Sequence, residues 1–501
     1  MNYFLGIDIG TSATKAICYD ELGNALKALS ISYPLYQLKH GYAEQDPDDW
    51  YNATKKLILT LTKDYPDIKG IGLSGQMHGL VLLDKNDEIL RKSIIWCDNR
   101  AAKEKEEIEH VIGKERIKEI TGNEAMAPFT LAKLLWVKNN EPDIFAKINK
   151  VLLPKDYVKY RLTGAFKTEF SDASGMQLLD IKNKCYAKDI LSAFDIKEEW
   201  LPFLDESVNI VGYLNNDGFK NLDNIFVVGG ASDQAACALG NGIIKANDLS
   251  IALGSSGVVF KPIYKKEINH VKNMQVFMHA IKDTYHIMGV TNGCGLSYSW
   301  YLDNLCKYEE KNAKDINENI YNYIEDILKH TKPGANGVIY LPYLNGERTP
   351  HNDTAATASF LGIRQSTTKN EMTRAVIEGI CYSLRDCYKL LEKDKYNIFV
   401  SGGGANSETW IDILAANLNQ DILFNNVTEA GTLGVAILAM TAFGKYKSIE
   451  DAISHIVKTN KRVQANPSLA TIYDRYYQLY QNGYKSLKQY YQLQKDLEEL
   501  K

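Results

Sequence analysis

Two acidic residues follow apolar, strand-like runs, where a carboxylate can take part in chemistry. Asp8 ends "YFLGID" ahead of a turn that carries Thr11, Ser12 and, a little further on, Lys15. The N–H and hydroxyl groups of such a turn can hold phosphate oxygens. Asp233 follows "VVGGAS". Phosphoryl transfer needs held phosphates and a base for the acceptor hydroxyl, so we predict that Asp233 is the base and that Asp8 serves Mg²⁺ directly or through water.

A helix N-cap is the alternative interpretation of Asp233. Ser232 or Asp233 could accept a hydrogen bond from the backbone of a helix that begins near Gln234. The alanines around Asp233 leave room for a substrate, and reduced solvation there would raise the pKa of the carboxylate toward a useful base strength. This stretch alone leaves both interpretations open.

Two further glycine-bearing turns could hold a nucleotide. Their residues are Gly254, Ser255 and Ser256 in "ALGSSGVV", and Gly403, Gly404 and Asn406 in "VSGGGANS". Glycines at the end of a strand let another molecule approach the backbone closely, although hairpin and βα turns use the same residues. No Walker sequence occurs, so a nucleotide site here is not a P-loop, and "GCGLSY" matches only half of a dinucleotide fingerprint.

An acceptor with several hydroxyl groups needs polar side chains that converge on the base. "SGQMHG" offers Gln76 and His78 in a loop after a predicted strand. A single histidine is more often structural, but Gly-Gln-Met-His-Gly is an unusual sequence for a core. We therefore predict that this loop binds the acceptor.

The ends of strands must position these residues. The first 20 residues form two β-rich runs around the Gly-Thr-Ser turn, which predicts a β-hairpin, and a further turn follows at 21–24. Helical periodicity extends over 47–64 and 101–120, while 68–75 is typical of a buried strand and 150–157 of a strand that leads into a helix. Mixed strands and helices predict an α/β fold.

The same plan recurs from about residue 246, where "DLSIALGSSGVVFKPI" again gives strand, turn and strand. A chain of 501 residues is too long for one ordinary core, so we predict two domains, residues 1–245 and 246–501, on a duplicated plan. The second should contain a helical stretch at 296–330 followed by the segment "GVIYLPYL", a helix at 369–391, the strand "NIFVSGGG", helices from Ser407 and in "GTLGVAILAMTAFG", and an amphipathic packing helix at 470–497.

Composition excludes several classes of protein. The formal net charge of −4 gives no general attraction to nucleic acid or to an anionic membrane. Hydrophobic residues make up 45% and charged residues 24%, which is typical of a globular protein. We find no export signal and no apolar run of about 18 residues. The eight cysteines form no C-x-x-C pair, which favours reduced thiols and a cytoplasmic location.

Together the motifs resemble those of the FGGY carbohydrate kinases, from Tyr3 to about residue 445. The resemblance is carried by "GIDIGTSATK", "EQDPDDW", "GQMHG", "LPKDYVKYRLTG", "SDASG", "GGASDQAA", "YLNGERTPHND" and "SGGGANS". "GQMHG" together with "GERTPHND" is more specific than the opening motif. Within the family, the chain is most similar to members that phosphorylate D-xylulose.

The resemblance implies two ribonuclease-H-like, actin-like ATPase domains, with a ketose and MgATP meeting in the cleft between them. Residues 1–245 would bind the sugar and carry out catalysis, and residues 246–501 would bind the nucleotide. It implies that Asp233 accepts the proton of the sugar's terminal hydroxyl and that Asp8 is the metal-associated acid. It assigns no firm role to Glu347 and Arg348.

The remaining expected contacts follow the matching motifs. The expected sugar contacts are Gln76, Met77, His78, Asp233 and Gln234; the phosphate contacts are Thr11, Ser12, Lys15, Gly254, Ser255 and Ser256; and the adenosine contacts are Gly403, Gly404 and Asn406. Family analogy also suggests a homodimer, with no nucleic-acid or membrane partner.

Two departures leave the acceptor open. Gln234 follows the predicted base, as in glycerol kinases of the family, and "WCDNRA" is similar to gluconate kinases as well. Gluconate, ribulose or glycerol therefore stay possible acceptors, although "GQMHG" supplies no cation for a carboxylate substrate. A protein of another class, a nucleotide-gated sugar sensor without transfer, is the further alternative. The presence of both Asp8 and Asp233 favours catalysis.

Overall fold

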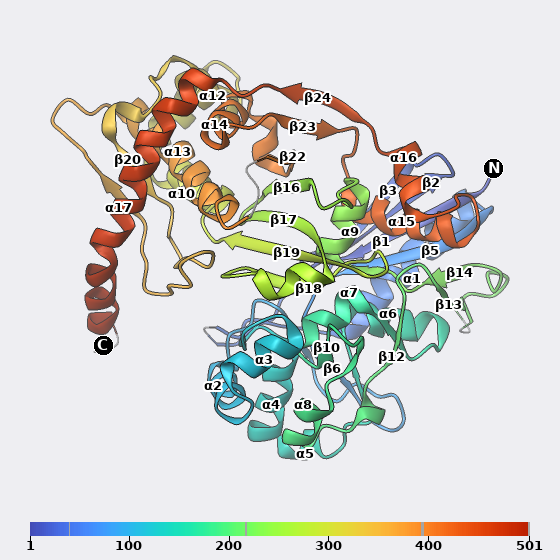
Figure 1. Cartoon of the computed structure of the whole chain (residues 1–501). Helices are drawn as coiled ribbons and strands as arrows, with labels where there is room; N and C mark the ends of the chain where they lie inside the picture. The colour runs from blue at the N-terminus through green and yellow to red at the C-terminus, as the bar shows by residue number, and fades with distance from the viewer. Residues whose placement is uncertain (40, 216–217, 392–394, 499–501) are drawn as a thin grey trace.

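The computed structural model describes residues 1–39, 41–215, 218–391 and 395–498. Its framework is a pair of seven-stranded β-sheets, one from each half of the chain (Figure 1). Helices pack on the sheets, which gives the predicted α/β class.

The first sheet is built around the predicted hairpin. β1 and β2 are antiparallel, β3 continues beyond β2, and β5 and β14 follow in parallel on the other side of β1. The bounds are β1 (Tyr3–Ile9), β2 (Ala13–Asp20), β3 (Ala25–Ser32), β5 (Ile68–Gly75), β13 (Ile210–Tyr213), β14 (Phe226–Val228) and β15 (Ala231–Ser232). β15 pairs with the end of β5, which brings the chain before Asp233 to the edge of the sheet.

The second sheet repeats this order. β16 takes the place of β1: it is antiparallel to β17, which pairs with β19, and it is parallel to β22, which leads to β23. The bounds are β16 (Asp248–Leu253), β17 (Gly257–Tyr264), β18 (Gln275–Met278), β19 (Thr284–Thr291), β22 (Asn397–Ser401), β23 (Ile422–Asn425) and β24 (Thr459–Val463). The duplicated plan predicted from the sequence is therefore confirmed in the strand order.

The helices are distributed over both halves. In the first half they are α1 (Pro47–Asp64), α2 (Ala102–Val111), α3 (Lys114–Thr121), α4 (Thr130–Asn140), α5 (Pro142–Phe145), α6 (Pro154–Thr163), α7 (Phe170–Ala173), α8 (Lys188–Ala193) and α9 (Asp233–Gly240). In the second half they are α10 (Gly295–Leu305), α11 (Lys307–Asp315), α12 (Ile320–His330), α13 (Lys369–Tyr388), α14 (Glu408–Leu418), α15 (Ala430–Ala442), α16 (Ile449–Ile456) and α17 (Pro467–Glu498).

The first-half predictions hold, although one helical pattern is divided. α1 occupies the predicted residues, and the Asp46 side chain caps it by accepting a hydrogen bond from Asp48 N at 3.1 Å. The stretch 150–157 is the predicted strand and helix, β8 (Lys150–Leu152) followed by α6. The helical pattern predicted at 101–120 forms two helices, because Gly113 has a φ of 89° that separates α2 from α3.

The helical stretch predicted at 296–330 is confirmed and consists of three helices. α11 and α12 are separated where Asn317 has a φ of 55° and the Asn319 side chain begins α12 by accepting from Tyr321 N. "GVIYLPYL" contains the strand β20 (Ile339–Leu341), which ends before Pro342, a residue that cannot donate to a ladder. β20 pairs with β21 (Ser359–Leu361).

Short elements complete the fold. They are β4 (Glu44–Gln45), β6 (Val81–Leu83), β7 (Ser93–Ile94), β9 (Lys167–Glu169), β10 (Leu179–Asp180), β11 (Cys185–Tyr186) and β12 (Phe203–Asp205), with 3₁₀ turns η1 (Ser174–Met176), η2 (Glu198–Trp200), η3 (Lys265–His270), η4 (Ala335–Gly337) and η5 (Gly403–Asn406).

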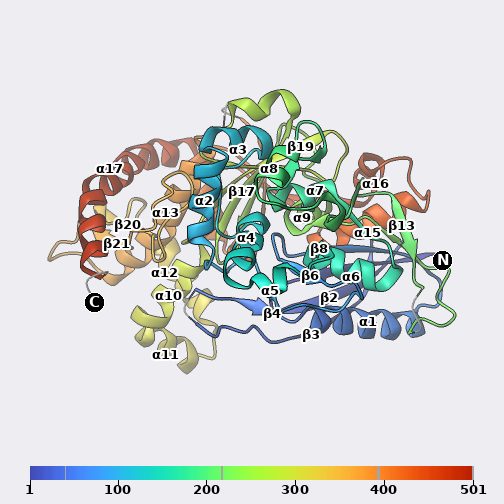
Figure 2. The ribbon, with the colours of Figure 1, turned by 90° about the horizontal axis from the view of Figure 1, so that it is seen from below.

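A helix from the second half covers the first sheet. α15 packs on β1, β5 and α9, and Figure 1 shows it beside the blue strands near the N-terminus. The approach is close because of glycines: a Cβ on Gly6 would lie 1.9 Å from Thr432 O, and one on Gly72 would lie 2.0 Å from Val435 O. α1 covers β2 and β3 on the other face (Figure 2). The first sheet is therefore completed by residues far along the chain.

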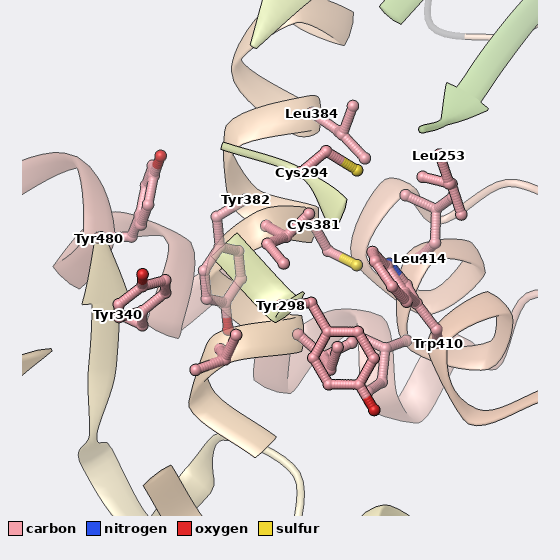
Figure 3. Packing of buried hydrophobic residues seen from close by; sticks show 14 of the residues in the cluster. Leu253, Cys294, Tyr298, Tyr340, Cys381, Tyr382, Leu384, Trp410, Leu414 and Tyr480 are labelled. Carbon is pink, nitrogen blue, oxygen red and sulfur yellow. The ribbon is translucent and has the colours of Figure 1, made fainter. Parts of the chain in front are cut away.

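The core of the second half supports the two glycine-bearing turns that are predicted to hold a nucleotide, here called the nucleotide-side turns. It packs Leu253 at the end of β16 with Trp410 and Leu414 of α14, and with Cys381 and Leu384 of α13 (Figure 3). The Ser407 hydroxyl caps α14 by accepting from Trp410 N at 3.1 Å, which confirms the predicted helix start. The turn that follows β22 is therefore fixed from behind by packed side chains.

The terminal helix packs as predicted from its tyrosine spacing. Tyr473 and Tyr480 of α17 are fully buried, and the Tyr480 hydroxyl lies 2.6 Å from the Tyr343 hydroxyl. Tyr484 stacks on His351 with ring centroids 3.6 Å apart. α17 therefore supports the loop that contains "GERTPHND".

Two findings bear on the class of protein. Across the described residues, no helix combines the length and the apolar character that a membrane crossing would need. All eight cysteines lie in the described residues and none forms a disulfide.

Two buried histidines of the second sheet should make stability depend on pH. His286 stacks on Phe260, with ring centroids 4.4 Å apart, and His279 lies beside both rings. Burial lowers the pKa of His279 to about 4, and burial together with His279 lowers the pKa of His286 well below its ordinary range. The unfolded chain then binds protons that the folded protein excludes. The free energy of unfolding should fall between pH 6.5 and 4, by up to ~1.4 kcal/mol per pH unit for each histidine.

Urea unfolding at pH 7, 6 and 5 measures this dependence. Carboxylates also titrate in this range, so the informative comparison is His286→Phe, which keeps a ring against Phe260 but cannot be protonated. We expect the variant to lose less stability than the wild type between pH 7 and pH 5. Parallel losses in the two proteins would contradict a role for His286.

Candidate active site

The first sheet brings the predicted acids and the acceptor loop to one edge. β1 and β5 are parallel, and Asp8 lies opposite Ser74 at their carboxyl ends. β15 pairs with the same end of β5, so Ser232 lies opposite Gly75. Asp233, the next residue, therefore lies at the edge from which the loop with Gln76 leaves the sheet.

Asp233 is the first residue of α9 and is half-buried. Its Oδ1 accepts a hydrogen bond from Gln234 N at 2.7 Å, whereas the Ser232 side chain caps nothing. The N-cap interpretation thus fails for Ser232. The hydrogen bond that Asp233 accepts comes from the adjacent residue, Gln234, and not from the second or third residue of the helix, as an N-cap bond would. Burial, followed by the charge of Asp8, raises the pKa of Asp233 to about 7, in the direction expected from its alanine surroundings. A carboxylate with this pKa suits a general base.

Asp8 has the donor set expected for a metal-associated acid. Its Oδ1 is buried and has no hydrogen-bond partner among the described residues. Burial raises its pKa, with Glu429 adding to the shift, while Ser74 and Lys15 oppose it. No group of three or more metal-ligating side chains occurs in the part of the chain that the structure describes. A Mg²⁺ ion held by one carboxylate and by substrate phosphates fits this arrangement.

The turn after Asp8 is held by residues that the sequence analysis did not single out. Trp96 donates from Nε1 to Thr11 Oγ1 at 2.9 Å, and Gln45 donates from Nε2 to Thr11 O at 2.6 Å. Both lie in motifs already quoted, "WCDNRA" and "EQDPDDW", but nothing in the spacing connects them with Thr11. Ser12 is exposed in the same turn.

Lys15 has a partner that was not predicted. Its Nζ lies 2.9 and 3.0 Å from the two carboxylate oxygens of Glu429, at the start of α15. Both side chains are 42% exposed, so the ion pair is screened and contributes little stability. The predicted phosphate contact of Lys15 therefore requires it to exchange a carboxylate for a phosphate.

The acceptor loop combines a structural glutamine with an available histidine. Gln76 is only 3% exposed, and its Nε2 donates to Gln45 Oε1 at 2.8 Å. Met77 packs among apolar residues of both halves, including Phe129 and Phe277. Gln76 therefore supports the loop through Gln45, and Met77 lies where apolar residues of the two halves meet.

His78 is held in a defined orientation. It has a φ of 66°, stacks on Phe129 at 4.4 Å, and its Nδ1 lies 2.8 Å from Gly175 O. Burial lowers its pKa to about 3, so the ring is neutral. Because a carbonyl only accepts, Nδ1 must carry the proton, and Nε2 is left as an acceptor for a hydroxyl group.

The two nucleotide-side turns also share one sheet edge. β16 and β22 are parallel, with Ala252 opposite Ser401 at their carboxyl ends. The turn with Gly254, Ser255 and Ser256 follows β16, and η5 with Gly403, Gly404 and Asn406 follows β22. α10 begins against the first of these turns, where Gly295 N donates to Gly254 O at 2.8 Å.

The three glycines after β22 serve different purposes. Gly402 has a φ of 89° and a Cβ there would lie 2.7 Å from Leu253 O, so the local fold needs it. A Cβ on Gly404 would lie 2.8 Å from Leu253 Cβ. A Cβ on Gly403 would meet nothing within 4 Å, so the fold itself does not require this glycine. Open space beside Gly403 is what an approaching ligand would need.

The loop with Glu347 and Arg348 is held by residues of the second half. Glu347 is buried, and its carboxylate accepts from Asn292 N and Arg348 N, each at 2.8 Å, and from Ser383 at 3.1 Å. The Arg348 side chain is exposed, and its charge is close enough to oppose protonation of His78. Glu347 thus fixes the loop, and the charge of Arg348 acts on His78 from the second half of the chain.

Comparison with known proteins assigns the chain to a family. The N-terminal domain of the FGGY family of carbohydrate kinases matches residues 3–240, and the C-terminal domain of that family matches residues 249–443. This chain is an FGGY carbohydrate kinase. The predicted domain boundary, between residues 245 and 246, falls in the gap between the two matched regions and stays a prediction.

Relatives of this FGGY kinase include xylulose and gluconate kinases. A xylulose kinase of Staphylococcus epidermidis is 37% identical over 97% of each chain. A ligand-bound crystal structure of xylulose kinase from Lactobacillus acidophilus has a TM-score of 0.89 and 29% identity, covering 97% of this chain and 99% of that one. A gluconate kinase from the same organism has a TM-score of 0.88 and 29% identity, covering 97% and 98%.

Proposed function

We propose that this FGGY kinase phosphorylates D-xylulose with ATP to give D-xylulose 5-phosphate. The observation that carries the proposal is Asp233, a half-buried carboxylate with a raised pKa at the sheet edge shared by Asp8 and the "GQMHG" loop. The identity of 37% to a xylulose kinase over nearly the full chain supports the acceptor.

In this proposal the terminal hydroxyl of the sugar lies beside Asp233, in line with the γ-phosphoryl group of ATP. Asp233 accepts the hydroxyl proton as the oxygen attacks phosphorus, and ADP leaves. The sugar contacts are Met77, His78 and Gln234, with the buried Gln76 supporting them. His78 accepts a sugar hydroxyl at Nε2 and so orients the acceptor.

The phosphates lie between the turns at the two sheet edges. Thr11 and Ser12 contribute from the first sheet, and Gly254, Ser255 and Ser256 from the second. Lys15 leaves Glu429 to contact a phosphate. A Mg²⁺ ion associated with Asp8 would neutralise phosphate charge. Gly403, Gly404 and Asn406 hold the adenosine, at a position where the open space beside Gly403 admits a ligand.

Gluconate is the second candidate acceptor, and one structural observation favours it. A carboxylate substrate needs a cation, and the "GQMHG" loop has none. Arg348, an exposed cation of the other half whose charge opposes protonation of His78, would supply that charge. The similarity to a gluconate kinase structure with a TM-score of 0.88 is in line with this candidate.

ADP release with MgATP against D-xylulose, D- and L-ribulose, gluconate, glycerol and no sugar tests the proposal. We expect strong turnover with D-xylulose and little without sugar. Preference for gluconate would overturn the acceptor while keeping the base, and Arg348→Gln should then abolish that preference. The absence of turnover with every acceptor would favour a nucleotide-gated sugar sensor. A homodimer and a cytoplasmic location stay predictions.

A further inference from the structure

Two of the sequence motifs have no role in the proposed reaction. "LPKDYVKYRLTG" forms α6, and "SDASG" forms α7 and η1. Both lie beneath the segment from Gly229 to Ser232 that leads into Asp233. Six of their polar side chains are fully buried: Lys155, Asp156, Lys159, Ser171, Asp172 and Ser174.

Ser171 joins this cluster to the backbone next to Asp233. Ser232 N donates to Ser171 Oγ at 3.0 Å, and Ser171 Oγ donates to Glu169 Oε1 at 3.0 Å. Glu169 in turn accepts from Ser171 N at 2.8 Å, from Asp172 N at 3.0 Å and from Ser207 Oγ at 2.8 Å. A hydroxyl that accepts from the backbone and donates to a charged carboxylate forms a polarised, directional pair of hydrogen bonds.

A second anchor holds the other end of the same segment. Lys159 Nζ donates to Gly229 O at 3.0 Å and to Asp156 Oδ1 at 2.8 Å. Lys155 also donates to Asp156 Oδ1 at 2.8 Å and lies 3.5 Å from Glu169. All four side chains have no exposure to solvent. Two lysines thus face two carboxylates, and the charges balance within the cluster.

Asp172 adds a third carboxyl group to this cluster. Burial raises its pKa well above the ordinary range; Lys155, whose Nζ lies 3.4 Å from Asp172 Oδ2, opposes the shift, while Asp156, Glu169 and Asp233 add to it. Apart from this ion contact, its two oxygens accept no hydrogen bond from the described residues.

The segment between the anchors has little room to adjust. Gly230 has a φ of 83°, and a Cβ there would lie 2.2 Å from Leu73 O. Gly230 N donates to Ser207 O at 3.1 Å. Lys159 holds Gly229 O and Ser171 holds Ser232 N. These two buried side chains therefore determine the direction in which the backbone enters α9.

We propose that Ser171 is a positioning residue that fixes the backbone of Ser232 and thereby the place of the Asp233 carboxylate. Loss of its hydroxyl would release one end of the segment. A displacement of about 1 Å in a reacting group can lower a rate by about 10²-fold. The proposal rests on the proposed role of Asp233 as the base.

Ser174 provides a matched control in the same segment. It is fully buried like Ser171, and its hydroxyl also makes two hydrogen bonds, donating to Ser171 O at 2.8 Å and accepting from Met278 N at 3.0 Å. Neither bond involves the segment before Asp233. Ser171→Ala and Ser174→Ala therefore remove the same atom from comparable surroundings. The lysines are poorer targets, because breaking a buried ion pair threatens folding.

Steady-state kinetics of the full chain, with MgATP and the best acceptor of the panel, form the first test. We expect Ser171→Ala to lower kcat by about 10- to 100-fold with KM values within about threefold, while Ser174→Ala stays within about threefold in kcat. Ser171→Thr, which restores a hydroxyl, should recover most of kcat. Equal losses in the two alanine variants, or a normal kcat in Ser171→Ala, would overturn the proposal.

Amide hydrogen exchange gives a readout that does not require turnover. The peptide that spans 227–240 should exchange at least tenfold faster in Ser171→Ala and be unchanged in Ser174→Ala. Unchanged protection in Ser171→Ala would refute the anchoring. Asp233→Asn, measured in parallel, separates the two hypotheses: an active Asp233→Asn removes the base assignment, whereas an inactive Asp233→Asn with a normal Ser171→Ala removes only the positioning role.

Discussion

Asp233→Asn is expected to lower kcat by about 10²- to 10⁴-fold, the range that a general base contributes. The amide has nearly the same shape and cannot accept the proton of the acceptor hydroxyl. The KM of the sugar should change little, because Met77 and His78 hold their positions through contacts that do not involve Asp233. Turnover near the wild-type level in this variant would remove Asp233 from the mechanism.

The same substitution should leave the protein at least as stable as the wild type. A carboxyl whose pKa is raised to about 7 in the folded state disfavours folding at pH values above its ordinary range, since the unfolded chain ionises first. Asp233→Asn removes that cost, so its melting temperature at pH 8 should equal or exceed the wild-type value. A clear fall in melting temperature would indicate that lost activity reflects misfolding. Asp233→Glu keeps the charge but displaces it, and should retain more activity than the amide.

The pH dependence of the wild type checks the same residue independently. Since the base must be ionised, kcat/KM should fall about tenfold per pH unit below the pKa of about 7. His78 is neutral throughout this range, so it should not contribute to the profile. A profile that is flat down to pH 5 would contradict the raised pKa.

Gly434→Ala is expected to destabilise the protein by about 3 kcal/mol, at the upper end of overpacking costs. In an ordinary helix this change would stabilise by roughly 1 kcal/mol, because alanine has the higher helix propensity. Here a Cβ would lie 2.0 Å from Ala236 O, where α15 crosses α9. α9 and α15 are in equally close contact at Gly240, where a Cβ would lie 1.9 Å from Ala430 O. The backbone of α9 therefore cannot move away from α15 without a large cost.

Gly431→Ala is the matched control on the same helix. A Cβ at this position would first meet Cys237 Sγ at 3.5 Å, an ordinary contact. Its melting temperature and urea midpoint should equal or exceed those of the wild type, while both should fall for Gly434→Ala. Equal behaviour of the two variants would show that the helix crossing tolerates a wider separation.

Local sequence signals predicted the elements that carry the site. The Gly-Thr-Ser and Gly-Ser-Ser turns gave the two hairpins, and an acid after two glycines gave Asp233, because turn chemistry and strand alternation depend on neighbouring residues. The helical periodicity over 47–64 likewise predicted α1, whose start is capped by Asp46. The helical patterns at 101–120 and 296–330 were predicted correctly, but they are interrupted at Gly113 and Asn317, where a left-handed residue divides an otherwise continuous pattern.

Local sequence signals could not predict contacts between residues that are distant in the chain. Lys15 pairs with Glu429, which is 414 residues away in the chain, and Trp96 reaches Thr11 from another loop. Single-sequence patterns contain no record of which side chains meet across a fold. Likewise the space beside Gly403, and the lack of it beside Gly402 and Gly404, depends on Leu253 in a neighbouring strand.

The packing of α15 on the first sheet has a consequence for synthesis on the ribosome. When residues 1–245 have emerged, β1 and β5 still lack the helix that covers one of their faces, and the glycines that receive it leave backbone and apolar side chains such as Phe4 and Ile17 open to water. The nascent first half cannot complete its fold until residues 430–442, which form α15, have also emerged. Premature termination before that point should therefore yield an aggregation-prone fragment rather than a folded domain.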